Sequence, residues 1–323
     1  MQNFDGKLAV ITGGGSGIGR ALAEQLAGAG CHLALCDLSP DGLAETAALC
    51  NAVNAGLNIS THSCDVSDEA AVLAARDEVV EAHDIEFVNL VFANAGIGGG
   101  GSFIVDERAD WERTFNVCWF GVYYTARAFV PLLMAADEGH LINTSSINGT
   151  WASLGPGVAQ TAYAAAKFAV KGFSEALITD LRLHAPHVKV SVVMPGHIGT
   201  SIGINSGKIH GRPDPMEMTS ADVAVIREQM IKRGKPVDNL PDAVIRGSIK
   251  QLGENFRDQA PTSAAQAATI ILDGVRADRW RILVGDDAIA LDEKVRANPE
   301  DAYEASFTEE LHADGHFHFT KDR

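Results

Sequence analysis

Tyr163 and Lys167 are four residues apart in residues 162–183, an alanine-rich stretch that we expect to be a long helix. This spacing places the phenol and the ammonium on one helix face, one turn apart. A free tyrosine has a pKa of about 10, and a nearby ammonium stabilises the phenolate and lowers that pKa. Such a phenol can protonate a ketone oxygen or accept a proton from an alcohol, so the pair predicts acid–base catalysis at a carbonyl group.

Two polar residues earlier in the chain could complete the set. Ser146 follows a predicted strand in the run Asn143-Thr144-Ser145-Ser146, and its hydroxyl could hydrogen-bond the same substrate oxygen. The neighbouring Ser145 is an alternative that the sequence leaves open. Asn116, in a predicted helix over 110–134, could extend a proton path from the lysine through a bound water to solvent. Each residue alone is also compatible with ordinary packing, so the prediction rests on their joint order.

A glycine-rich loop follows the first predicted strand, in Thr12-Gly13-Gly14-Gly15-Ser16-Gly17-Ile18-Gly19. The first glycine allows a tight turn out of the strand, and the later ones let a pyrophosphate approach the backbone. The helix that begins here offers unpaired N–H donors and a favourable dipole to phosphates. A glycine-rich turn without a ligand is the alternative. We predict a dinucleotide site that includes Gly13, Gly15, Ser16, Gly17, Ile18 and Gly19.

Asp37 ends the second predicted strand, about twenty residues beyond the loop. A carboxylate at this position accepts hydrogen bonds from the adenosine ribose and repels a 2′-phosphate. Neither Ser16 nor Leu38 supplies a cation for that phosphate. The sequence therefore predicts NAD rather than NADP, with Asp37 and Leu38 at the adenosine. The alternative is that Asp37 only caps the following turn.

Short apolar runs alternate with helical patterns along much of the chain. Strands this apolar need both faces covered, as in a parallel sheet, and the alternation implies right-handed crossovers. We predict an α/β, Rossmann-like, doubly wound parallel sheet of seven strands with helices on both faces. The expected strands are 8–11, 33–36, 59–64, 87–92, 140–143, 188–193 and 281–284, and the expected helices are 17–29, 41–52, 67–82, 110–134, 162–183, 220–233, 242–257 and 262–275.

The chain shows no internal repeat or linker, so we expect residues 1–323 to form a single catalytic domain. Residues 201–218 contain several Gly and Pro and are expected to be a loop, within an insertion over 201–260 that would cover the substrate as a lid. Residues 286–323 are expected to be an acidic tail. The tail contains His312, His316 and His318 without a second ligand cluster, so we predict no metal site.

Composition limits the partners. The chain has 26 Lys and Arg against 42 Asp and Glu, a net charge of −16, which disfavours nucleic-acid binding. No apolar run reaches the roughly 18 residues of a membrane span, and the N-terminal residues lack the pattern of a signal peptide. The five cysteines form no C-x-x-C pair and no evident disulfide framework. We expect a cytoplasmic protein without a nucleic-acid or membrane partner.

With these features the sequence resembles the short-chain dehydrogenase/reductase family over about residues 5–200 and, more loosely, 262–285. Ala93 replaces an Asn that the family often has, and the gap between Ser146 and Tyr163 is longer than in many members. The matching motifs are Thr12-Gly13-Gly14-Gly15-Ser16-Gly17-Ile18-Gly19, Asp65-Val66, Asn94-Ala95-Gly96, Asn116, Ser146, Tyr163-x-x-x-Lys167 and Pro195-Gly196-x-x-x-Thr200.

The resemblance implies roles for the remaining motif residues. Asp65 and Val66 would contact the adenine ring, and Lys167 would also bind the nicotinamide ribose. Asn94, Ala95 and Gly96 would support the central sheet and line the cofactor. The nicotinamide carboxamide would be held by Pro195, Gly196, Ile198 and Thr200. The resemblance further implies a homotetramer or homodimer, often assembled through the helices that carry Asn116 and Tyr163.

The candidate substrate pocket is mostly apolar, and its expected wall residues are Trp151, Leu154, Val158, His197 and Ile202. We therefore expect a bulky, largely apolar secondary alcohol or ketone; for Trp151, packing against a neighbouring subunit is the alternative. A catalytically silent NAD-binding sensor on the same fold is a second reading of the sequence, disfavoured by the intact Tyr–Lys pair. A dehydratase or epimerase is a third, and such enzymes usually carry a different first loop.

Overall fold

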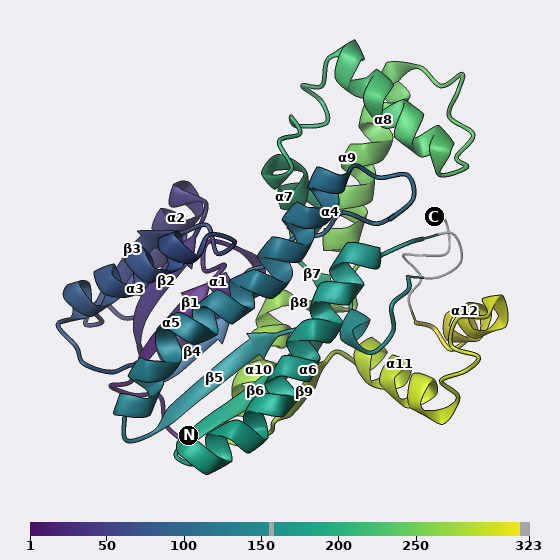
Figure 1. The fold of residues 1–323 in the computed structure, drawn as a ribbon. Helices are drawn as coiled ribbons and strands as arrows, with labels where there is room; N and C mark the ends of the chain where they lie inside the picture. The colour runs from purple at the N-terminus through teal and green to yellow at the C-terminus, as the bar shows by residue number, and fades with distance from the viewer. Residues whose placement is uncertain (155–157, 317–323) are drawn as a thin grey trace.

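Seven parallel strands form the central sheet of the computed structural model, which describes residues 1–154 and 158–316. Their order is β3-β2-β1-β4-β5-β6-β9 (Figure 1). The predicted doubly wound α/β fold is confirmed. The strands are β1 (Leu8–Thr12), β2 (His32–Asp37), β3 (Ile59–Ser63), β4 (Leu90–Ala93), β5 (Gly139–Thr144), β6 (Val188–Pro195) and β9 (Arg281–Val284).

The strand order reverses next to β1. The chain runs outward through β2 and β3, returns to pair β4 with β1, and then continues to β5, β6 and β9 on the other side. Ligands of open α/β sheets bind beyond the carboxyl ends of the strands at such a switch point. The loops that follow β1 and β4 therefore meet where a dinucleotide is expected.

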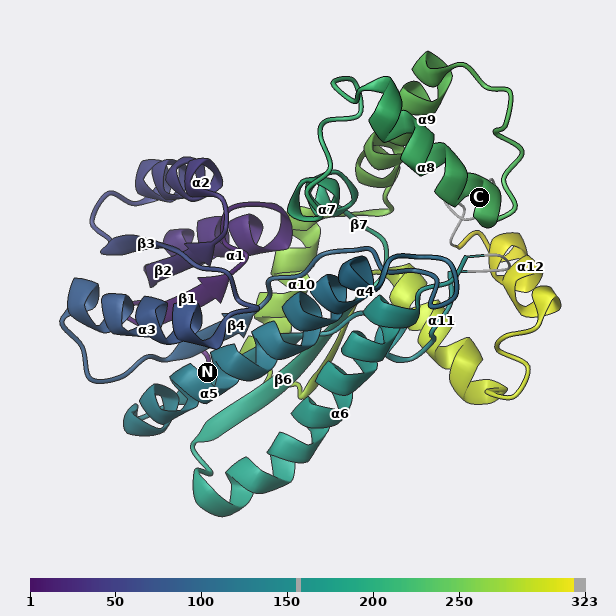
Figure 2. The ribbon, with the colours of Figure 1, turned by 45° about the horizontal axis from the view of Figure 1, so that its top comes forward.

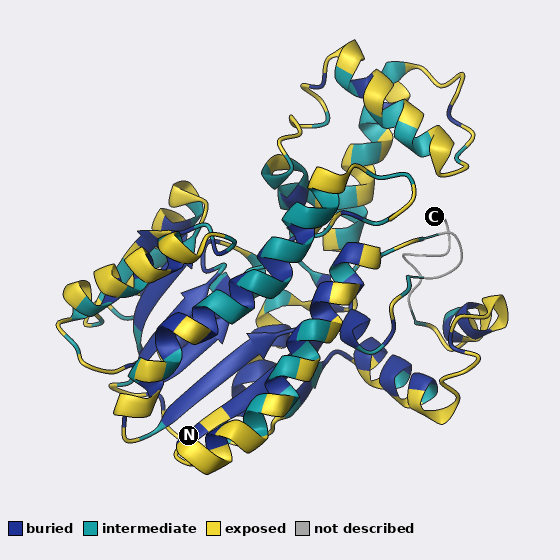
Figure 3. Cartoon of the chain, viewed as in Figure 1, coloured by how far each residue is buried: buried dark blue, intermediate teal, exposed yellow. Residues whose placement is uncertain are grey.

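Helices cover both faces of the sheet, and the strands are buried between them (Figure 3). On one face, α1 (Gly17–Gly28), α2 (Pro40–Val53) and α10 (Ala264–Arg276) contribute residues such as Leu22, Leu43 and Ile271 to one core. The opposite face is covered by α3 (Glu69–His83), α5 (Gly121–Ala135) and α6 (Thr161–His184). These two apolar layers fix the sheet that positions the site.

The stretch expected as one helix over 110–134 has three parts. A π-helical turn, Asn116–Phe120, lies between α4 (Arg108–Phe115) and α5, and the Gly121 N–H donates to the Asn116 carbonyl five residues earlier. Single π turns inside α-helices are frequent at functional sites. Among the described residues, Arg108–Ala135 is the one helix long and apolar enough to cross a membrane by length and composition, and half of its apolar window is buried in the fold.

The insertion is helical, and it projects from the sheet (Figures 1 and 2). It contains α7 (Ile202–Ile209), α8 (Ser220–Lys232) and α9 (Asp242–Asp258). The expectation of a loop over 201–218 is wrong for its first half, because Ile204 packs against Gly253 of α9 and the Ser206 hydroxyl accepts from the Gly98 N–H. The insertion has a small apolar core of its own, formed by Met218, Val223 and Ile245.

The C-terminal segment is also folded, which corrects the expectation of an acidic tail. It forms α11 (Asp286–Ala297) and α12 (Ala305–Ala313). Leu291 and Val295 on α11 pack with Phe307 and Leu311 on α12, each pair four residues apart on one helix face. Acidic residues between these apolar ones hide the pattern in the sequence. His316 ends the described segment, and His318 lies outside the described residues.

Candidate active site

The glycine loop is built by close backbone contacts. Gly13 has φ +69°, and a Cβ on Gly19 would lie 2.1 Å from the Gly13 carbonyl oxygen. Neither position therefore accepts another residue without a shift. Ser16 is the N-cap of α1 in extended conformation, with Gly17 and Ile18 opening the helix. The first N–H groups of α1 are thus placed for an anion, as the motif predicts.

Asp37 lies directly against this loop. Its carboxylate accepts from the Gly15 N–H at 2.9 Å and from the Ser39 N–H at 2.9 Å. Arg20, the cation that follows the loop, is engaged with the Gly15 carbonyl oxygen at 2.7 Å and with Thr46 at 3.0 Å. Leu38 beside Asp37 is 46% exposed. The edge of the loop therefore presents a carboxylate and an apolar side chain.

Asn94 ties three strands together at the switch point. Its N–H donates to the Thr12 hydroxyl at 3.0 Å and its amide nitrogen to the Thr12 carbonyl at 3.1 Å, while its amide oxygen accepts from Thr144 at 3.4 Å. The Ala95 N–H also donates to the Thr12 hydroxyl. A Cβ on Gly96 would lie 3.5 Å from Lys167 Nζ. The run after β4 therefore joins the glycine loop to the Tyr–Lys helix.

Asp65 and Val66 follow β3 at the same edge. The Asp65 carboxylate accepts from Ser67 and from Arg113 Nη2 at 2.9 Å, and Val66 is buried. Burial raises the pKa of Asp65, but the hydrogen bonds from Ser67 and Arg113 outweigh it and hold that pKa below its ordinary value. Arg113, three residues before Asn116 on α4, is a site residue that sequence reasoning missed.

Ser146 and Ser145 have different partners. The Ser146 side chain is close enough to the Tyr163 phenol to lower the pKa of that phenol, and its hydroxyl accepts from the Asn148 N–H. Ser145 is 1% exposed, and its hydroxyl donates to the Lys167 carbonyl at 2.7 Å. Ser146 is therefore the serine beside the phenol, and Ser145 holds the helix backbone.

Lys167 lies on the other side of the phenol. Its Nζ is 5.5 Å from the centre of the Tyr163 ring and donates to the Thr144 carbonyl at 2.8 Å. Burial lowers the pKa of Lys167 and raises the pKa of Tyr163, which the Ser146 hydrogen bond partly opposes. The pKa of Tyr163 is thus raised and not lowered, because burial outweighs the effect expected from the ammonium, which donates to Thr144.

Cys118 lies on the π turn, close to Tyr163 and Lys167. Sequence reasoning did not select it for the site. Its thiol donates to the Ile97 carbonyl at 3.2 Å, and a Cβ on Gly96 would lie between it and Lys167. Asn116 begins the same turn, and its carbonyl accepts from Gly121. The structure therefore places Ser146, Tyr163 and Lys167 together beyond the end of β5, and the role of Asn116 stays a prediction.

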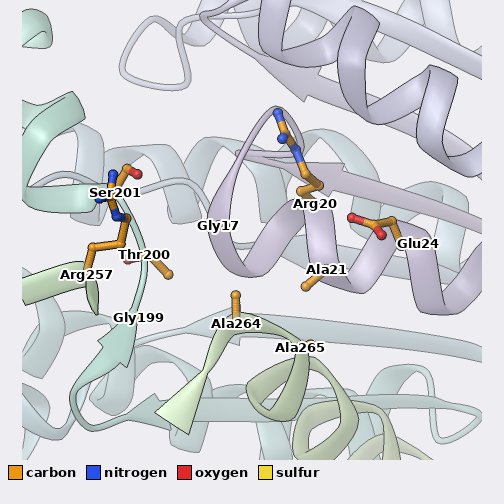
Figure 4. Close-up of a pocket in the computed structure, with 10 residues that line it drawn as sticks. All are labelled: Gly17, Arg20, Ala21, Glu24, Gly199, Thr200, Ser201, Arg257, Ala264 and Ala265. Atoms are coloured by element: carbon orange, nitrogen blue, oxygen red, sulfur yellow. The ribbon is translucent and has the colours of Figure 1, made fainter. Parts of the chain in front are cut away.

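The residues after β6 complete the cofactor side. The Gly196 N–H donates to Val284 at the end of β9, and Ile198 in β7 (Ile198–Gly199) pairs with Thr262 in β8 (Thr262–Ser263). A pocket of about 310 Å³ opens beside them between α1 and α10 (Figure 4). Gly17 and Thr200 line it, whereas Tyr163 and Ser146 do not. It borders the phosphate loop and is separate from the phenol.

Comparison with known proteins decides the family. The family model described as short chain dehydrogenase matches residues 7–208. The chain belongs to this family. The putative oxidoreductase SadH of Mycobacterium tuberculosis is 38% identical over 294 residues, which cover 90% of this chain and 91% of that protein. Human epidermal retinol dehydrogenase 2 is 32% identical over 225 residues, which cover 69% of this chain and 70% of that protein.

Solved structures agree with this membership. A short chain dehydrogenase/reductase from Burkholderia phymatum in complex with NAD has a TM-score of 0.73 at 30% identity, with 93% of this chain and 96% of that chain covered. A metagenomic short-chain oxidoreductase in complex with NADP has a TM-score of 0.54 at 32% identity, with 60% of this chain and 83% of that chain covered. The protein is thus an oxidoreductase of the short-chain dehydrogenase family.

In this short-chain dehydrogenase two of the expected pocket residues are buried against other parts of the chain. Trp151 is 2% exposed, donates to the Ala302 carbonyl at 2.6 Å and packs on Phe307 of α12. The C-terminal segment of its own chain covers this ring. The His197 ring is buried as well, with Nε2 2.7 Å from the Phe256 carbonyl oxygen of α9.

The other three expected pocket residues keep part of their surface exposed. Leu154, Val158 and Ile202 are half-buried, and Ile202 begins α7. Between Leu154 and Val158, residues 155–157 lie outside the described residues. The apolar wall of the substrate pocket therefore stays a prediction.

The insertion of this dehydrogenase is tied to the loop after β4 and to α4. Ser206 accepts from the Gly98 N–H at 2.8 Å, and His210 Nε2 lies 3.0 Å from the Gly98 carbonyl oxygen. Asp110 on α4 pairs with both His210 and Arg212, the latter at 2.6 Å. These contacts join residues about a hundred positions apart, as the separations of 108 and 102 residues show. No local pattern in the sequence could have revealed them.

Proposed function

We propose that this protein is an NAD-dependent oxidoreductase that interconverts a secondary alcohol and a ketone. The observation that carries the proposal is the grouping of Ser146, Tyr163 and Lys167, with the Lys167 ammonium 5.5 Å from the Tyr163 ring centre and the glycine loop at the same sheet edge. A hydroxyl and a phenol that converge in this way can hold one substrate oxygen between them.

The described residues fit a dinucleotide. The glycine loop has no room for side chains at Gly13 and Gly19, and the start of α1 offers N–H donors to phosphates. NAD, when bound, accepts or supplies the hydride. Asp37 supports NAD over NADP, because a carboxylate at this edge repels a 2′-phosphate and Arg20 is already paired. A relative that binds NADP makes this preference a point to test.

The chain's own residues would carry the proton. In oxidation the Tyr163 phenolate accepts the alcohol proton while Ser146 holds the oxygen in line. In reduction the Tyr163 phenol donates that proton to the ketone oxygen. Lys167, buried beside the ring, holds positive charge near the phenolate, and Asn116 on the π turn would continue the path toward solvent.

The substrate is proposed to be bulky and largely apolar. Leu154, Val158 and Ile202 support this, as does the similarity to a protein named as a retinol dehydrogenase. We also propose a homo-oligomer in a reducing, cytoplasmic setting. All five cysteines are unpaired and buried, which is consistent with such a compartment.

Turnover tests the proposal directly. We would follow NADH absorbance with NAD, and NADPH absorbance with NADP, over secondary alcohols graded by size. The proposal predicts turnover with NAD that favours the bulky alcohols. Tight NAD binding without turnover on any alcohol would instead favour a cofactor sensor, and a preference for small aliphatic alcohols would contradict the proposed substrate class.

A further inference from the structure

Asp287 is a buried carboxylate outside the motifs of the active site. It occupies the first turn of α11 and is 3% exposed, whereas its neighbour Asp286 is exposed. The chain reaches it from β9 through Gly285, whose φ of +101° turns the backbone. A single acidic residue would already satisfy the start of a helix, so a second, buried one requires a separate reason.

Its partner is the segment after β6. The Asp287 carboxylate accepts from the His197 N–H at 2.6 Å. A Cβ on Gly196 would lie 2.4 Å from each of its oxygens, so the carboxyl group occupies the space that a side chain at 196 would take. The Pro195-Gly196-His197 turn therefore rests directly on Asp287.

Burying the Asp287 carboxylate costs free energy of folding, yet the fold keeps it buried. Burial raises the pKa of Asp287, although the N–H groups of His197 and Ala288 lower it in part. No Lys or Arg of the described residues pairs with Asp287, and a buried charge without such a partner is unfavourable compared with an apolar residue of similar size. Stability alone therefore does not account for an aspartate here, whereas an acceptor aimed at one backbone N–H does.

The same turn is held from its other side. The His197 ring reaches the Phe256 carbonyl and lies against the Phe256 ring, with centres 4.4 Å apart and planes tilted by 42°. Further along the segment, Thr200 lies against the glycine loop, within 3.3 Å of a Cβ placed on Gly17. A shift at His197 would thus be passed to a residue that touches the phosphate loop.

We propose that Asp287 is a positioning residue that presets residues 196–200 for the nicotinamide end of the cofactor. The inference rests on the proposed function, which assigns that segment to the cofactor. Asp287 acts through the His197 backbone and does not touch the reacting atoms. Its removal should weaken cofactor binding more than it slows the chemical step, because the proposed acid–base residues lie after β5 and on α6.

The test compares Asp287→Asn, Asp287→Ala and the matched control Asp286→Ala in the full chain. NADH affinity is measured by fluorescence titration, KM for NAD and kcat by turnover, and folding by thermal unfolding. We expect Asp287→Ala to raise Kd and KM about tenfold or more, the effect of losing one hydrogen bond to a charged group. Asp287→Asn should recover much of this, since its amide oxygen can still accept from His197, and Asp286→Ala should match the wild type.

The contradicting outcomes are distinct. If Asp287→Ala is folded and binds NADH as tightly as the wild type, the inference is wrong while the proposed function stands. Equal falls in the thermal midpoint of the Ala and Asn variants, with unchanged KM, would assign Asp287 to folding alone. If the wild type itself binds no nicotinamide cofactor, the proposed function fails, and the inference fails with it.

Discussion

The two adjacent serines after β5 show how the surroundings of a residue determine its role. Ser146 meets the Tyr163 phenol, whereas Ser145 is bonded to the backbone of α6. The sequence predicted both as candidates, and only the direction of each side chain separates them. Arg113 and Asp287 could not be predicted, because their partners Asp65 and His197 are 48 and 90 residues away.

At Asp37, one charge is expected to set the cofactor preference. Replacing it by asparagine keeps the shape and one acceptor for the Gly15 N–H but removes the charge that repels a 2′-phosphate. We expect Asp37→Asn to lower the ratio of kcat/KM for NAD over NADP by about tenfold or more, as for a lost interaction of about 1.4 kcal/mol. Asp41→Asn, exposed on α2, is the control. An unchanged ratio would show that Asp37 only caps its turn.

The state of Tyr163 predicts a pH dependence. Burial raises the pKa of Tyr163, so little phenolate is present near neutral pH. The phenolate, which accepts the alcohol proton, becomes more populated as pH rises. The kcat/KM for oxidation should therefore increase with pH from about 6 to 10, while reduction, which needs the phenol, should fall only at the alkaline end. In Ser146→Ala, which loses the bond that lowers this pKa, the oxidation limb should move to higher pH. A flat oxidation profile, or a limb that moves down, would count against this assignment.

Elements differ in how strongly their sequences predict them. The strands and the helices that cover the sheet have clear apolar periods, and most observed bounds lie within two or three residues of those expected. By contrast, α7, α11 and α12 were missed because each is short and its apolar residues are separated by glycines or acids. Their stability comes from contacts with distant elements, which no local period records.

The C-terminal helices are expected to hold the catalytic-serine loop through Trp151. This ring fills a core with Phe307 and donates to the Ala302 carbonyl. Trp151→Ala should lower the free energy of unfolding by about 3–5 kcal/mol, the usual cost of emptying such a site. Urea unfolding measures it, and Trp280→Ala, at a ring that is 44% exposed, should cost far less. Equal costs for the two variants would mean that α12 does not depend on Trp151.

At the scale of the whole molecule, the sheet brings residues from five loops to one edge. The glycine loop, Asp37, the Asn94 run, Ser146 and the Pro195 turn all follow parallel strands of this sheet. The predicted doubly wound parallel sheet therefore implied a shared site before any distance was known. The packing of the insertion and of the C-terminal helices could not be deduced, because both lie outside the regular alternation of strands and helices.

An aromatic surface on the π turn, α5 and α6 bears on assembly. Trp119, Tyr123 and Phe173 are half-buried and contact one another, with the Trp119 and Phe173 rings 5.5 Å apart. We expect a dimer or tetramer by light scattering and a shift toward monomer in Tyr123→Glu, because a charge would be buried at the contact. Leu183→Glu, at the exposed end of α6, should leave the assembly unchanged. A monomeric wild type would rule out this interface.

The central claim is that Tyr163 is the acid–base group of a nicotinamide-dependent oxidoreductase, and Tyr163→Phe tests it most directly. The measurement is NAD-linked oxidation of the best alcohol by the wild type and the variant, with NADH affinity determined on the same samples. We predict that turnover falls by about 10²–10⁴-fold, the usual contribution of a positioned proton-transfer group, while NADH binding is unchanged. A variant that keeps turnover within a few-fold of the wild type would contradict the account.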